Sequence, residues 1–128
     1  MRVSTQQWGT VLVCACVWLL APTASANAAT VFVPPGGDLQ AAINLAQAGD
    51  VITLAAGASY VGNFVLPNKG DLLDYITIRS GAPDAALPGA RVRITPAYAA
   101  QLPKIYSPNS MSALRTAAGA NHYRLQFL

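Results

Sequence analysis

The chain has 128 residues, with 8 Lys or Arg, 5 Asp and no Glu, and its formal net charge is +3. Both cysteines, Cys14 and Cys16, lie near the start, and His122 is the only histidine. This composition excludes a disulfide scaffold, a Cys-ligated zinc site and a two-histidine metal motif from the rest of the chain. The basic excess is too small and too scattered to indicate nucleic-acid binding.

Residues 1–28 predict a secretory signal peptide. An uncharged apolar run over 11–21 is followed by small residues, and two A-x-A sites predict cleavage after Ala26 or Ala28. The run is shorter than the ~20 residues of a membrane span. We therefore expect a secreted or periplasmic protein, with residues 29–128 as one domain or a piece of one, and no stable membrane association after cleavage.

Residues 30–33 predict a short strand, and residues 39–48 predict a helix. Asp38 suits the N-cap, because its carboxylate can accept hydrogen bonds from the first turn. Gly49 is expected to end the helix as its C′ residue. The apolar positions follow i, i+3, i+4, i+7 spacing: Leu39, Ala42, Ile43 and Ala46. One narrow, Ala-rich stripe suits a helix that packs on a sheet edge or on the end of a solenoid.

After the helix, apolar residues recur at every second position, which predicts strands. The expected strands are 51–54, 60–66 (interrupted at Gly62-Asn63), 75–79, 91–95 and 122–128, with candidate short strands at 104–106 and 113–116. No Asn-Gly or Asp-Gly two-residue hairpin turn joins them. Connections that are neither tight hairpins nor helices favour a coil-by-coil solenoid, although the spacing between repeats is irregular.

Three of these strands share one alternation. Ile76/Ile78, Val92/Ile94 and Leu125/Phe127 should face one side, and Thr77/Arg79, Arg91/Arg93 and Arg124/Gln126 the other. If these strands stacked with their apolar pairs aligned, Arg93 would lie beside Arg124 and Arg91 beside His122. Like charges on neighbouring strands repel, and an acidic glycan would relieve that repulsion through Arg–carboxylate contacts. The simpler interpretation is a solvated outer face.

The carboxylates give no firm catalytic signal. Asp71 and Asp74 lie three residues apart and can bind calcium or serve as an acid–base pair, but a solvated turn also explains them. Asp38 is expected to cap the helix, Asp50 to lie in a turn and Asp84 in a loop. His122 is expected on the surface. We therefore predict no catalytic, cofactor-binding or metal-binding residue in this chain.

One segment resembles a known family. VPPGGDLQAAIN at 33–44 and AGDVITLAAG at 48–57 are similar to the N-terminal cap of right-handed parallel β-helix proteins of the pectate-lyase-like superfamily. The resemblance implies a mainly β fold over 29–128: a capping helix and the first coils of a β-helix, truncated after two or three coils. An uncapped last strand, 122–128, would then allow self-association.

The resemblance also implies a function. The chain would be the N-terminal part of a secreted protein that binds or degrades acidic polysaccharide, with calcium as a possible cofactor of a full-length parent. The working residues of that family sit on middle coils, so no active site is expected within 29–128, and whether the parent is a lyase or a hydrolase stays open. The alternatives are a non-catalytic, adhesin-like β-helix and a small exported protein of another fold.

Overall fold

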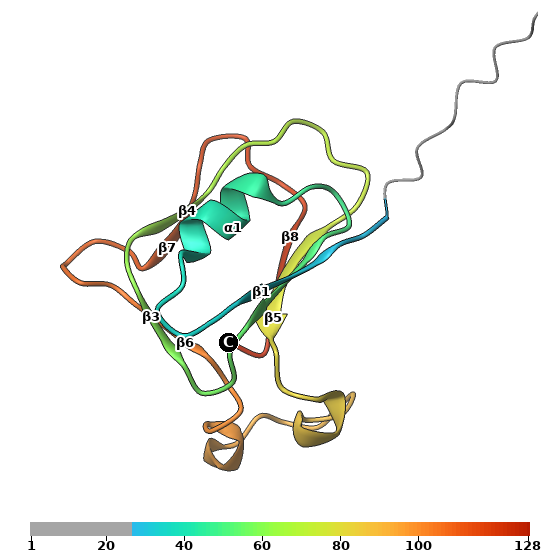
Figure 1. The fold of residues 1–128 in the computed structure, drawn as a ribbon, viewed down its shortest axis with the longest axis vertical. Helices are drawn as coiled ribbons and strands as arrows, with labels where there is room; N and C mark the ends of the chain where they lie inside the picture. Colours follow the sequence, from blue (N-terminus) through green and yellow to red (C-terminus); the bar gives the residue numbers. More distant parts are fainter. Residues whose placement is uncertain (1–26) are drawn as a thin grey trace, which may run out of the picture.

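The computed structural model describes residues 27–128, and these are mostly β-strands in parallel sheets with one α-helix (Figure 1). Nearly all of the predicted signal peptide, with the Ala26 site, lies outside the described residues. No helix within 27–128 is long and apolar enough to cross a membrane. The elements are β1 (Thr30–Val33), α1 (Leu39–Leu45), β2 (Val51–Leu54), β3 (Ser59–Val61), β4 (Phe64–Leu66), β5 (Ile76–Ser80), the 3₁₀ turns η1 (Asp84–Ala86) and η2 (Pro96–Tyr98), β6 (Lys104–Tyr106), β7 (Leu114–Thr116) and β8 (Tyr123–Gln126).

The strands form three sheets, in which every pair is parallel. Sheet A has the order β1-β2-β5-β8, sheet B pairs β3 with β6, and sheet C pairs β4 with β7. The chain thus visits sheets A, B and C as β2, β3, β4, visits them again in the same order as β5, β6, β7, and returns to sheet A as β8. The predicted β-rich fold is confirmed at this level.

The core lies between the three sheets and beneath α1 (Figure 1). The alternation predicted for sheet A is confirmed on its inner side, because Ile76 pairs with Tyr123 and Ile78 with both Ile52 and Leu125. Fully buried side chains come from the sheet and from the helix: Ile52, Leu54, Ile76, Ile78, Leu39 and Ile43. These residues exclude water along one continuous apolar interior.

The start of α1 follows the prediction. Asp38 Oδ1 accepts a hydrogen bond from Ala41 N at 2.9 Å, so Asp38 is the N-cap. The predicted stripe is buried in full: Leu39, Ala42, Ile43 and Ala46. Local capping chemistry and the helical period were sufficient to identify both features.

The end of α1 corrects the prediction, because the helix stops at Leu45 and Gly49 is not its C′ residue. Lys69 Nζ donates to Asn44 O at 2.8 Å and to Ala46 O at 2.5 Å, which satisfies carbonyls that the helix leaves open. Burial lowers the pKa of Lys69, and the nearby Asp50 carboxylate acts in the opposite direction. Gly49, with φ of 87°, lies in the turn that follows.

Asp50 holds that turn, as expected of a turn residue. Its carboxylate is buried and accepts from Ala29 N at 2.9 Å and from Gln47 N at 2.8 Å. Two backbone N–H groups therefore satisfy the two oxygens of a buried charge. The contact also fastens the chain just before β1 to the turn just before β2.

The predicted strand 91–95 is wrong. These residues lie in a segment over 81–103 that leaves the sheets between β5 and β6 and carries η1 and η2 (Figure 1). Val92 and Ile94 are about half exposed there. Since β5 already pairs with β2 on one edge and with β8 on the other, it has no free edge for 91–95.

Two other predicted strands have different limits. The stretch 60–66 forms two strands in different sheets, because the chain turns at Gly62-Asn63 between β3 and β4. The last strand is shorter than 122–128, since His122 and Phe127 both have positive φ, 57° and 56°, and bound β8 on either side. The candidate short strands at 104–106 and 113–116 are confirmed as β6 and β7.

Candidate functional site

The outward side of sheet A collects the polar and cationic residues of the strands. The register places Thr30, Val51, Thr77 and Arg124 in one row across the sheet, and Phe32, Thr53, Arg79 and Gln126 in the next. We call these two rows, with the flanking Tyr75 and His122, the outer face. Two arginines therefore project from adjacent strands, one from each row.

At one end of the outer face, Arg124 stacks on Tyr75. Its Cζ lies 4.5 Å from the centroid of the Tyr75 ring, a cation–π distance. The His122 ring packs beside the same tyrosine, with 5.2 Å between ring centroids. Arg124 is exposed and forms no ion pair with any residue in 27–128. The stacking thus holds a guanidinium in place while leaving its donors open to an anion.

The backbone at His122 is strained in support of this cluster. Its φ of 57° is uncommon for a residue other than glycine and costs about 1–2 kcal/mol. His122 O accepts from Ile76 N at 2.9 Å, so the conformation is fixed by the sheet. Nδ1 of its ring lies 2.9 Å from Asn121 Oδ1. The ring is thereby held next to Tyr75 where the chain enters β8.

At the other end of the outer face, Arg79 forms an ion pair with Asp84 of η1. Cζ of Arg79 lies 5.8 Å from the centroid of the Phe127 ring. Beside the pair is an open groove of about 380 Å³, which crosses β1, β2 and β5 and includes Thr30, Thr53 and Asp84 in its lining. The groove thus combines hydroxyl groups with one arginine and one carboxylate.

The structure corrects the predicted basic rows. Arg124 pairs with Thr77 rather than with Arg93, and His122 precedes β8 beside Tyr75 rather than beside Arg91. Arg91 and Arg93 lie outside the sheets, in the segment 81–103. The outward directions of Arg79 and Arg124 agree with the sequence pattern, but their placement in one sheet depends on the pairing of β5 with β8.

The aspartates do not converge on a site. Asp71 and Asp74 are exposed in the connection between β4 and β5. Asp38 caps α1, and Asp50 is buried in its turn. Among residues 27–128, no group of three or more His, Cys, Asp or Glu side chains lies close enough together to hold a metal ion.

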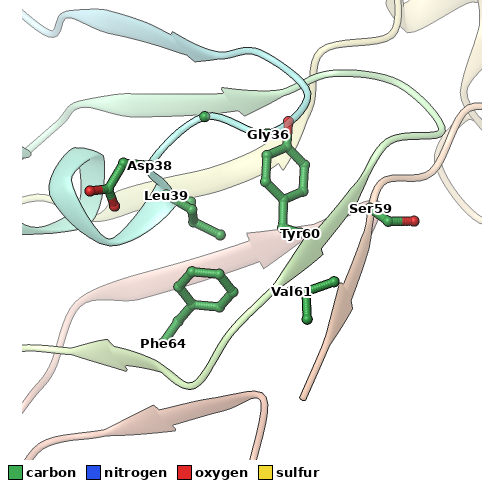
Figure 2. A pocket seen from close by; sticks show the side chains of 8 residues that line it. Gly36, Asp38, Leu39, Ser59, Tyr60, Val61 and Phe64 are labelled. Carbon is green, nitrogen blue, oxygen red and sulfur yellow. The ribbon is translucent and has the colours of Figure 1, made fainter. Parts of the chain in front are cut away.

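A second groove, of about 390 Å³, lies between the start of α1 and β3 (Figure 2). Leu39, Tyr60 and Phe64 gather on its inner side, and Asp38 lies at its rim (Figure 2). Its main polar groups already serve the fold. Tyr60 Oη donates to Val33 O at 2.7 Å and accepts from Ala55 N at 2.9 Å, while Asp38 accepts from Ala41 N. Tyr60 and Asp38 therefore hold the fold together at this groove.

A third depression, of about 430 Å³, is apolar and lies where β6, β7 and β8 meet. Its lining is Ile105, Ala113, Leu114, Leu125, Phe127 and Leu128. Within 27–128, each of these strands pairs along one edge only. Backbone groups and apolar side chains are thus exposed on the same end of the molecule.

Comparisons of the chain with family models, with curated proteins and with solved structures return no match. The resemblance to the pectate-lyase-like superfamily therefore stays a prediction from residues 33–57.

Proposed function

We propose that residues 29–128 form the N-terminal cap and first coils of a right-handed parallel β-helix. Two successive passes through sheets A, B and C in the same order support this proposal, as does the helix α1 over the apolar interior. Crossovers between parallel strands of one sheet are right-handed in about 98% of cases. A cap is also what the first coil of a stacked repeat needs.

We further propose that the outer face binds acidic polysaccharide outside the cytoplasm. The observation that carries this proposal is the Arg124 guanidinium, which stacks on Tyr75 and has no acidic partner within 27–128. Guanidinium groups bind carboxylates through two parallel N–H···O bonds. On neighbouring strands, Thr77 adds a hydroxyl group that can hydrogen-bond to sugar hydroxyls, and the Thr53 hydroxyl, which donates to Val31 O at 3.3 Å, can still accept from them.

The proposal assigns binding and no cleavage step to these residues. Glycoside hydrolysis generally uses two positioned carboxyl groups. Asp84, whose carboxylate lies next to the outer face, is ion-paired with Arg79. Binding of this kind suits either the N-terminal part of a polysaccharide-degrading protein or an adhesin-like surface protein.

Affinity electrophoresis of the exported chain tests the proposal, with polygalacturonate in the gel and dextran as the neutral reference. Polygalacturonate should retard the wild type, and Arg124→Gln should weaken the retardation several-fold. Arg115→Gln is the matched control, because Arg115 is exposed on β7 in sheet C and carries the same charge. Equal losses in both variants, or no retardation of the wild type, would refute binding at the outer face.

A further inference from the structure

Arg79 uses only part of its hydrogen-bonding capacity. A guanidinium offers five N–H donors in a planar fork, and Asp84 Oδ1 engages one of its terminal nitrogens, Nη2. The Nε atom of Arg79 is buried and has no hydrogen-bond partner among residues 27–128. An unmet buried donor is unfavourable. The terminal nitrogens, one of which holds Asp84, are therefore the donors that an incoming carboxylate can reach.

Asp84 is held weakly in its position. Its side chain is 84% exposed, whereas that of Arg79 is 24% exposed. The contact with Arg79 is the one side-chain hydrogen bond that Asp84 forms within the described part of the chain. Exposed ion pairs contribute little to stability. Another carboxylate can therefore replace Asp84 on Arg79 without a large loss of folding free energy.

The surroundings of Arg79 have the size and chemistry of a sugar site. The adjoining groove of about 380 Å³ falls in the range of small-ligand pockets. Its lining includes Thr53 of β2, Arg79 of β5 and Asp84 of η1. The groove continues along sheet A toward β1, while Arg124 projects from β8 on the other side of β5.

We propose that this groove is a uronate-binding subsite. In the free protein, the Asp84 carboxylate occupies the position on Arg79 that the ligand carboxylate would take. The carboxylate of an incoming sugar displaces Asp84 and accepts hydrogen bonds from the terminal nitrogens of Arg79. The displaced Asp84 stays nearby on η1 and competes with the ligand for Arg79, so it lowers the affinity of the groove. This inference rests on the proposed binding of acidic polysaccharide and adds a second carboxylate site to that of Arg124.

The test is calorimetric titration with a galacturonate oligomer in 150 mM salt, where distant charges are largely screened. Asp84→Asn should raise the affinity about two- to fivefold, the range expected from an exposed ion pair. Asp71→Asn is the matched control, since Asp71 is also exposed and loses the same charge. It should bind like the wild type.

A double-mutant cycle isolates the role of Arg79. In an Arg79→Gln background, Asp84→Asn should no longer raise the affinity, because its partner is gone. The Nε–H resonance of Arg79 gives a readout that does not depend on mutants: it should shift when the oligomer is added to the wild type. A persistent gain in the Arg79→Gln background, or an equal gain from Asp71→Asn, would overturn the inference.

Failure of the inference and failure of the proposed function are distinguishable. If Arg124→Gln weakens binding while Asp84→Asn behaves like Asp71→Asn, the outer face binds uronate but Asp84 does not compete with the ligand for Arg79. If neither the wild type nor Asp84→Asn binds the oligomer, both proposals are refuted.

Discussion

The side-chain amide of Gln40 forms two hydrogen bonds with the backbone of Val65. Nε2 donates to Val65 O at 2.9 Å, and Oε1 accepts from Val65 N at 2.8 Å. Gln40 lies on α1 and Val65 on β4, whose other edge pairs with β7. One side chain thus takes the place of a neighbouring strand at this position. The helix therefore protects a strand edge as well as the apolar interior.

Replacing Gln40 should destabilise the fold measurably. In Gln40→Glu the carboxylate can still accept from Val65 N but cannot donate to Val65 O, so a backbone acceptor loses its partner. We expect a loss of about 1–3 kcal/mol in unfolding free energy, measured by urea denaturation. Gln47→Glu is the control with the same charge change, because that side chain is exposed and, within residues 27–128, bonds only to Leu45 O. Equal effects would contradict the role given to Gln40.

Ile43 should be the main apolar contact of the cap, since its side chain is fully buried. Ile43→Ala leaves a cavity beneath α1 and should cost about 2–5 kcal/mol in unfolding free energy. On the same helix, Leu45 is 77% exposed, and Leu45→Ala should change stability by no more than about 0.5 kcal/mol. Thermal denaturation of the two variants compares them directly. A drop for Leu45→Ala as large as that for Ile43→Ala would mean that the helix packs through another face.

Tyr123 should make stability fall at high pH. Its hydroxyl donates to Pro67 O at 2.7 Å, and burial raises the pKa of Tyr123. The unfolded chain therefore ionises first, near pH 10, and unfolding becomes easier as the pH rises from there toward the folded-state pKa. At pH 8 the unfolding free energy of the wild type should be about 1 kcal/mol larger than that of Tyr123→Phe. This difference should shrink at pH 11.

Urea denaturation of both proteins at the two pH values measures the change. Lys69, whose pKa is lowered by burial, acts in the opposite direction, because its contribution to stability improves as the pH rises. It is present in both proteins and cancels in the difference. A difference that stays constant from pH 8 to pH 11 would show that Tyr123 does not titrate differently in the two states.

The exposed strand edges should promote self-association. Leu125 on β8 is 47% exposed and lines the apolar depression between β6, β7 and β8. Open edges with apolar side chains pair with other chains, and a lysine there opposes such pairing. Size-exclusion chromatography should therefore show concentration-dependent oligomers for the wild type and mostly monomer for Leu125→Lys. A wild type that is monomeric at every concentration would refute this expectation.

Local features of the fold could be predicted from the sequence because their causes are local. The Asp38 cap and the stripe that includes Ile43 depend on residues within two turns of helix. The end of the helix could not be predicted in this way, because Lys69 reaches it from a distant part of the chain. Period-two alternation identified most strands, but 91–95 has the same pattern and lacks a neighbouring edge.

The candidate site was predictable only in part for the same reason. Alternation gave the outward direction of Arg79 and Arg124, whereas the contacts of Arg124 with Tyr75 and of Arg79 with Asp84 depend on which strands pair. On one edge β5 pairs with β8, and in the sequence these two strands are separated by the segment 81–103, β6 and β7. No residue pattern within either strand specifies that pairing.

Binding at the outer face is tested most directly by mapping a galacturonate oligomer onto the folded chain through amide chemical-shift changes. Binding at the outer face predicts that the changes concentrate at 75–79 and 122–126 and saturate with added oligomer. The exposed basic residues of the other sheets, Lys104 on β6 and Arg115 on β7, should stay unperturbed. Changes centred on Lys104 or Arg115, or no saturable changes at 75–79 and 122–126, would contradict binding at the outer face.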